Sequence, residues 1–181
     1  ISNPAFNPMP YDPIFADGPG TGLDYPRSYW PATAGTPLPD DGPALKAKLG
    51  EQIALLKAWD RRWAVDSAPQ SLAIFWGEEL WAKSAPAART AGVSVYDYMR
   101  TKATPTQRLE ALAAASDKLA ADFGKWQTPW GEINRFQRIS PAIVHPFDDS
   151  QPSIPVGFGS ARWGSLAAFG ARAYPNTKKW Y

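Results

Sequence analysis

The stretch WQTPWGEINRF, residues 126–136, marks the point where a run of helix-like segments gives way to an extended, loop-rich second part of the chain. Two tryptophans bracket a proline, a glycine follows, and then acidic, apolar, polar, basic and aromatic residues come in succession. The apolar residues Ile133 and Phe136 are separated by Asn134 and Arg135, which is not the spacing of an amphipathic helix. The order therefore predicts an extended, partly buried segment that begins in a Pro-Trp-Gly turn.

The strongest helix signal lies upstream of this stretch. Pro43 suits the first turn of a helix, and apolar residues then recur at spacings of three and four. This pattern predicts one helix over residues 43–63, with a single apolar stripe. The stripe consists of Leu45, Leu49, Ile53, Leu56, Trp59 and Trp63.

A second helix is predicted after Ser67. Ser67 and Gln70 have the spacing of a capping box, and an amphipathic pattern follows them. The apolar positions of this pattern are Leu72, Phe75, Trp76, Leu80 and Trp81. Because proline disrupts helix interiors, we expect the helix to end near Ser84, before Pro86.

Two further helices are predicted from their caps. Ser94 and Asp97 predict the start of a short helix. Thr104 and Gln107 enclose a proline at the first helical position and form a capping-box pattern, and Gly124 is the natural stop of the helix that follows.

The ends of the chain lack such periodicity. Residues 1–41 hold nearly half of the 19 prolines together with several aromatic residues. Since frequent prolines prevent regular elements, we expect an ordered coil that wraps over another surface; a disordered linker is the alternative. Strands are predicted at Ile139–Val144, Val156–Phe158 and Ser165–Ala173.

These signals predict a mainly helical fold with irregular proline-rich segments and a few short strands. The chain divides into a proline- and aromatic-rich coil at 1–41, a helical segment at 42–124 and an extended, loop-rich segment at 125–181. We interpret all three as parts of one larger domain.

The composition limits the function classes. Apolar residues make up 44% and charged residues 20% of the 181 residues, as in ordinary globular domains. The net charge is +2 and the basic residues are scattered, so no nucleic-acid partner is expected. The absence of cysteine excludes disulfides and thiolate metal sites. No apolar run has the length of a membrane span, and no membrane partner is expected. The first residue is Ile and not Met, which we interpret as the mark of a processed or nicked product.

Two groups in the second half invite a catalytic or metal-binding interpretation. His145 is the only histidine, and the spacing places no serine or aspartate beside it; before Pro146, it is interpreted as a loop residue bonded to the backbone, with a triad as the alternative. Asp148 and Asp149 suggest either a metal site or turn caps. Adjacent side chains in an extended segment point to opposite sides, which favours turn capping.

The remaining candidates also have structural interpretations. Glu132 and Arg135 are free to pair with each other or to bind backbone groups. They also suggest proton transfer, but a carboxylate beside a fixed cation stays ionised, which favours a structural pair. The glycines of the region match no phosphate-binding pattern, and we assign them to turns and to close packing of aromatic rings. They are Gly157, Gly159, Gly164 and Gly170, near Phe158, Trp163 and Phe169.

Several words of the sequence resemble the penicillin acylase family of N-terminal nucleophile hydrolases, close to its N-acyl-homoserine-lactone acylases. The late words are PWGEINRFQR (129–138), FDDSQPSIPVGFGSARWGSLAAFGAR (147–172) and YPNTKKWY (174–181). The earlier words are LLKAWDRRWAVDS (55–67) and LAIFWGEEL (72–80). The resemblance covers about Leu45 to Tyr181 and places the chain in the later part of the β subunit.

This resemblance implies an αββα core and a serine nucleophile at the start of the β subunit, exposed by autocatalytic cleavage, whose own amino group acts as base. It also implies an oxyanion asparagine and an apolar acyl pocket. Residue 1 here is Ile, and the peptide nitrogen of Ser2 cannot act as an amine base. Asn3 and Asn7 do not sit in the family's oxyanion motif. No catalytic residue is therefore expected in this chain, and its substrate-binding residues stay unknown.

The expected function is part of an amide hydrolase that cleaves N-acyl bonds of acyl-homoserine lactones or penicillin-type β-lactams. The resemblance implies companion chains from the same precursor, namely the α subunit and the rest of the β subunit, and a periplasmic or secreted location. No cofactor or metal is expected in this chain, although the resemblance leaves room for a structural calcium elsewhere in the assembly. The alternative is a stand-alone module that stacks exposed aromatic residues on sugars or peptides.

Overall fold

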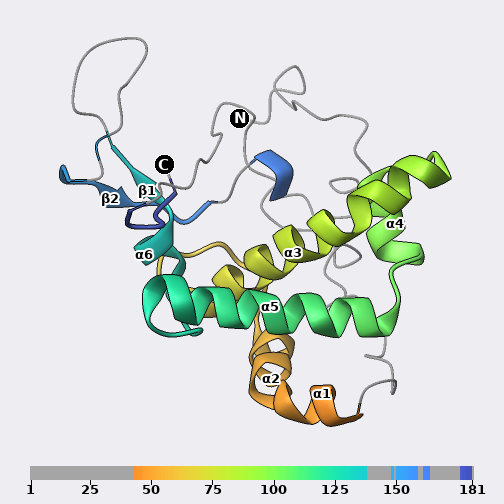
Figure 1. Ribbon diagram of the computed structural model, residues 1–181. Helices are drawn as coiled ribbons and strands as arrows, with labels where there is room; N and C mark the ends of the chain where they lie inside the picture. Colours follow the sequence, from red (N-terminus) through yellow and green to blue (C-terminus); the bar gives the residue numbers. More distant parts are fainter. Residues whose placement is uncertain (1–42, 138–147, 149, 159–160, 164–175, 181) are drawn as a thin grey trace.

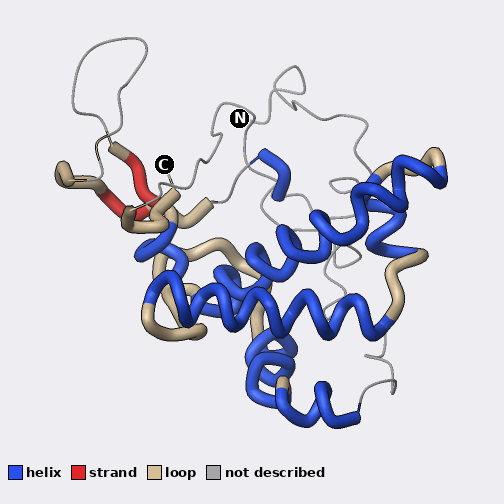
Figure 2. The backbone as a smooth tube through the Cα atoms, viewed as in Figure 1, coloured by secondary structure: helices blue, strands red, loops and turns tan. Residues whose placement is uncertain are grey.

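The computed structural model describes residues 43–137, 148, 150–158, 161–163 and 176–180. The helices are α1 (Pro43–Lys48), α2 (Gly50–Ala58), α3 (Ala68–Ala91), α4 (Val95–Thr101), α5 (Pro105–Phe123) and α6 (Trp130–Ile133). The strands are β1 (Arg135–Phe136) and β2 (Ile154–Pro155), and η2 (Ala161–Trp163) is a 3-10 turn. The described part is mainly helical with short strands, as the sequence predicts (Figures 1 and 2).

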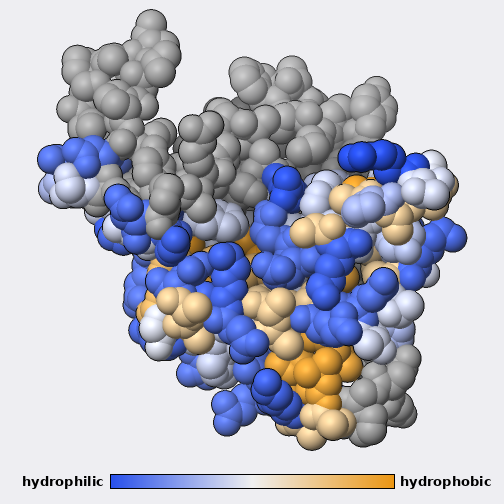
Figure 3. Space-filling view, in the orientation of Figure 1, coloured by the Kyte–Doolittle hydropathy of each residue, from blue (hydrophilic) through white to orange (hydrophobic). Residues whose placement is uncertain are grey.

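Helices α3 and α5 pack along each other at the centre of the molecule (Figure 1). Their facing side chains include Trp76 and Leu80 of α3 and Leu109 and Leu112 of α5, all fully or almost fully buried. Trp76 also donates its indole N–H to the carbonyl oxygen of Arg108 at 2.9 Å, which links the two helices. Hydrophilic side chains cover much of the outer face seen in Figure 3.

The apolar stripe of residues 43–63 is confirmed, but one continuous helix is not. Leu49 separates α1 from α2. Helix-type backbone hydrogen bonds nevertheless continue across it, from the N–H of Leu49 to the carbonyl oxygen of Leu45 and from the N–H of Ile53 to the carbonyl oxygen of Leu49. The helix then ends at Ala58, because Trp59 adopts an extended conformation. This exit keeps the Trp59 indole buried in the core and lets it donate to the carbonyl oxygen of Arg62 at 3.2 Å.

Helix α3 begins where predicted and ends later than predicted. The Ser67 hydroxyl accepts a hydrogen bond from the backbone N–H of Gln70, which confirms the cap. The helix runs through Pro86 to Ala91, so the predicted end near Ser84 is wrong. Ser84 and Ala88 are both buried, on one face, and Pro86 is exposed. Packing on both sides of the proline therefore outweighs the hydrogen bond that the proline cannot make.

Helices α4 and α5 follow the predicted caps. Ser94 caps α4, and the Thr104 hydroxyl and Gln107 side chain form a complete capping box at the start of α5. Gly124 ends α5 with a φ of 81°, in the left-handed region that glycine adopts without strain. No helix of the described residues is long and apolar enough to cross a membrane.

Replacement of Thr104 by alanine tests the capping box. Thr104→Ala leaves the N–H of Gln107 without the acceptor that lies 3.2 Å away, and we expect a loss of about 1 kcal/mol in the free energy of unfolding, measured by urea titration. Thr104→Ser keeps the hydroxyl and is the matched control, expected to stay within about 0.5 kcal/mol of the parent protein. Equal losses in the two variants would contradict a role for the hydroxyl.

The stretch 126–136 is only partly extended. A single helical turn, α6, occupies Trp130–Ile133, which corrects the prediction of a continuous extended segment. The turn buries Trp130 and Ile133 together before the chain continues into β1. β1 pairs antiparallel with β2, with Arg135 opposite Pro155 and Phe136 opposite Ile154.

The predicted strands have different outcomes. The predicted strand at residues 156–158 is wrong. The residues that pair with β1 lie just before it, at Ile154 and Pro155 in β2. Residues 139–144 and 165–173 lie outside the described residues, as does the predicted coil at 1–41.

The described end of the chain packs on the core. Trp180 pairs with Asn134 in a parallel bridge, with hydrogen bonds of 2.7 Å from Arg135 N to Trp180 O and from Trp180 N to Ile133 O. The Trp180 ring stacks on Phe75 at a centroid distance of 5.5 Å. Residues from α3, α6 and the late chain thus meet at one place.

Candidate functional site

The most elaborate polar structure of the described residues lies where α3, α6 and β1 meet residues 148 and 150–158. Here buried or half-buried side chains direct N–H groups at main-chain carbonyl oxygens of the loop around β2. We call this set the polar anchor. Its members are Gln70, Trp130, Asn134, Arg135 and Gln137.

Gln70 ties the start of α3 to the loop. Its fully buried side chain donates to the carbonyl oxygen of Gly157 at 2.6 Å and accepts from the backbone N–H of Ala64 at 2.9 Å. In a capping box this side chain would turn back to the N–H of Ser67. The buried amide is used for the long-range contact instead, so only half of the predicted capping box forms.

Trp130 and Asn134 converge on one carbonyl group. The oxygen of Phe158 accepts from the Trp130 indole N–H at 3.0 Å and from the Asn134 amide at 2.6 Å. The side-chain amide of Asn134 also donates to the carbonyl oxygen of Val156 at 3.3 Å. The main-chain carbonyl oxygen of Asn134 accepts from the N–H of Val156 at 3.1 Å. Asn134 therefore holds the chain on both sides of Gly157.

Arg135 binds the backbone and not the predicted carboxylate. Its guanidinium donates to the carbonyl oxygen of Gly131 at 2.9 Å and to Oγ and O of Ser153 at 3.0 and 2.5 Å. Glu132 instead forms an exposed ion pair with Lys125, at 3.4 Å. The predicted Glu132–Arg135 pair is wrong, because the fork of the guanidinium is filled by carbonyl and hydroxyl acceptors.

Gln137 and Asp148 close the loop at its start. The Gln137 amide donates to the carbonyl oxygens of Asp148, Gln151 and Pro152 at 2.8 to 3.3 Å and accepts from the Asp148 N–H at 2.8 Å. Asp148 caps the next turn, since its carboxylate accepts from both N–H and Oγ of Ser150. The hydrogen bond from the Ser150 hydroxyl lowers the pKa of the Asp148 carboxyl group. Turn capping is thus confirmed for Asp148.

Some of the candidate residues fall outside the part of the chain that the structure describes. These are His145, Asp149, Gly159, Gly164, Phe169 and Gly170. Gly157 is described, and a methyl group there would lie 3.5 Å from the Ala64 backbone, an ordinary contact. Within the ranges that can be described, no three histidine, aspartate or glutamate side chains gather as metal ligands would.

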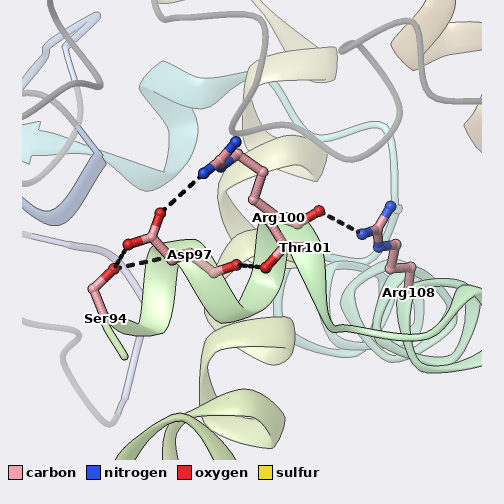
Figure 4. A network of polar contacts seen from close by, with 5 residues as sticks. All are labelled: Ser94, Asp97, Arg100, Thr101 and Arg108. Atoms are coloured by element: carbon pink, nitrogen blue, oxygen red, sulfur yellow. Dashed lines mark hydrogen bonds and ion pairs between the residues drawn. The ribbon is translucent and has the colours of Figure 1, made fainter. Parts of the chain in front are cut away.

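A second polar network organises α4 (Figure 4). The Asp97 carboxylate accepts from the Ser94 hydroxyl at 2.8 Å and from the Arg100 guanidinium at 3.2 Å. These two contacts, the hydroxyl first, lower the pKa of Asp97. At the other end of α4, Arg108 donates to the carbonyl oxygens of Met99 and Arg100 at 3.2 and 3.0 Å.

Arg108 is a buried cation, 8% exposed, and it lies at the negative end of the α4 dipole. Burial lowers the pKa of its guanidinium group, yet arginine keeps its proton in proteins. Its charge is therefore balanced by helix carbonyls. This arrangement joins α4 to α5.

The titration of Asp97 provides a test of the α4 network. A carboxyl group with a lowered folded pKa stabilises the fold fully above its unfolded pKa of about 3.9, and the contribution is lost as the pH falls through the lower folded value. Ser94→Ala should raise the pKa of Asp97 towards its ordinary range, as followed by NMR titration. The parent protein should then lose more stability than Asp97→Asn between pH 7 and pH 3. Parallel pH profiles for these two proteins would contradict this linkage.

An aromatic cluster fixes η2 against α3. Trp163 donates its indole N–H to Glu78 at 2.6 Å, and Arg162 forms an ion pair with the same carboxylate. The Arg162 guanidinium lies 4.7 Å from the ring centroid of Trp81, at cation–π distance. Tyr96 completes the cluster by donating its hydroxyl to the carbonyl oxygen of Arg162 at 2.8 Å.

The described tryptophans are mostly enclosed by the protein. Each is buried or half-buried, and the core cluster includes Trp59, Trp76, Trp130 and Trp163. A module that stacks sugars or peptides needs aromatic faces open to solvent. Trp30 lies outside the described residues.

The described side chains therefore define a helical scaffold that anchors an irregular loop. The polar side chains of the anchor are directed mainly at backbone carbonyl oxygens, whereas Ser94 and Ser150 donate their hydroxyl groups to the carboxylates of Asp97 and Asp148. The sequence predicts none of Gln70, Trp130, Asn134 and Gln137 as anchors. For the three amides, the only signal is a polar side chain among apolar residues.

A protein-family model for penicillin amidase matches residues 24–180. The chain belongs to this family. A search of curated proteins found no match. Family membership relates the chain to amidases, hydrolases that act on amides, and confirms the family named by the sequence words at 55–67 and 129–138.

Proposed function

We propose that this chain is the later part of the β subunit of an N-terminal nucleophile amide hydrolase, with the nucleophilic serine on another segment or chain. The observation that carries the proposal is the family match over residues 24–180. The polar anchor supports it, because its side chains bind main-chain carbonyl oxygens and hold one loop on the helices, as expected of a structural segment. In this proposal the described helices form one layer of a larger αββα domain.

The proposed reaction is hydrolysis of an N-acyl bond, which releases a carboxylic acid and an amine. The amine is a homoserine lactone or a β-lactam nucleus, as the resemblance to acyl-homoserine-lactone acylases suggests. The free amino group of the terminal serine would take the hydroxyl proton, and an asparagine and backbone N–H groups outside this segment would stabilise the oxyanion. We further propose companion chains from the same precursor and a periplasmic or secreted location.

The test uses the protein expressed from the whole reading frame. We expect N-terminal sequencing to show a new terminal serine that was internal in the precursor, and we expect acyl-homoserine lactones or penicillins to release their amines. Replacement of that serine by alanine should abolish both cleavage and activity. An assembly without a new N-terminal serine, threonine or cysteine would exclude the mechanism.

The proposed partners need a separate measurement. Native mass spectrometry of the purified enzyme should give the summed mass of this segment and its companion chains. If the 181-residue chain alone is a well-folded monomer that does not bind the remainder of its precursor, the proposal of companion chains is wrong.

A further inference from the structure

We draw no further inference here: the strongest candidate, the exposed apolar face that Phe136 and Ile154 form across the paired strands β1 and β2, carries none because nothing in the described residues shows what covers it.

Discussion

Trp130→Ala is expected to lower the free energy of unfolding by about 3–5 kcal/mol, the cost typical of removing a buried aromatic ring. Trp130 is 0% exposed and lies edge to face with Trp180 at a centroid distance of 5.5 Å. Its indole N–H also binds the carbonyl oxygen of Phe158. The substitution therefore opens a cavity and weakens the polar anchor at once.

Local exchange rates distinguish loss of the anchor from a general loss of stability. The N–H of Val156 binds Asn134, and the N–H of Trp180 binds Ile133, so both hydrogen bonds flank the missing ring. Under native conditions, hydrogen exchange of these two amides should accelerate more in Trp130→Ala than that of amides in the middle of α5. Uniform acceleration across the protein would contradict a local anchor.

Two further variants separate the contributions of Trp130. Trp130→Phe keeps an aromatic ring but removes the N–H, and we expect a smaller loss of about 1–3 kcal/mol. Phe136→Ala removes a neighbouring ring that is 43% exposed, and the expected loss is about 1 kcal/mol or less. If Trp130→Ala cost no more than Phe136→Ala, burial of the Trp130 ring would not be the source of stability.

The sequence predicts helix starts well in this chain because the cap contacts are local. Ser67, Ser94 and Thr104 each bind the N–H three residues ahead, so a window of four residues holds the whole signal. The stop at Gly124 is equally local. Each of these contacts forms as predicted.

Predictions of helix length fail where distant packing decides. The helix after Ser67 was expected to end before Pro86, since a window around the proline reveals only the missing N–H. The buried face formed by Ser84 and Ala88 carries α3 onward. Likewise, α2 ends before Trp59 because the indole packs into the core there, and the spacing of apolar residues does not predict that packing.

Most partners of the polar anchor lie far away in the sequence. Gln70 and Gly157 are 87 residues apart in sequence, and Asn134 and Phe158 are 24 apart. An amide side chain can bind almost any carbonyl group, so its partner cannot be deduced from spacing. The sequence words shared with the penicillin acylase family identified the region, although not what each residue does there.

The structure shows which contacts the residues of one of these shared stretches make. In PWGEINR, Trp130 fills the core, Asn134 and Arg135 bind loop carbonyls, and Gly131 permits close approach of two segments. A methyl group at Gly131 would lie 2.8 Å from Cβ of Pro155 and 2.9 Å from the carbonyl oxygen of Val65. Core packing, close approach of segments and backbone hydrogen bonds thus account for Trp130, Gly131, Asn134 and Arg135 in this stretch.

The second large effect is expected at Gly77 in α3, where the Trp163 ring lies directly on the helix. A methyl group at Gly77 would lie 2.6 Å from Cη2 of Trp163 and 2.8 Å from Cζ2. Real Cβ atoms do not approach other atoms so closely, so the ring must move. The ring is rigid and is held by its hydrogen bond to Glu78 and by edge contacts with Trp81 and Tyr96.

Gly77→Ala should therefore lower the free energy of unfolding by about 1–3 kcal/mol through overpacking, although alanine favours helix by up to about 1 kcal/mol. Gly50→Ala in α2 is the matched control, because no atom lies within 4 Å of the added methyl group. We expect no loss there, and a gain of up to about 1 kcal/mol. Urea titration of both variants shows whether the two effects have opposite signs.

A double-mutant cycle assigns the cost at Gly77 to Trp163. Trp163→Ala alone should be costly, since the ring is buried and its removal leaves a cavity. Once the ring is gone, the methyl group of Gly77→Ala has space, and the second substitution should be neutral or stabilising. The two substitutions would then be non-additive, as expected of residues in direct contact. Simple additivity would mean that the Trp163 ring does not rest on Gly77, and that η2 does not dock on α3 in this way.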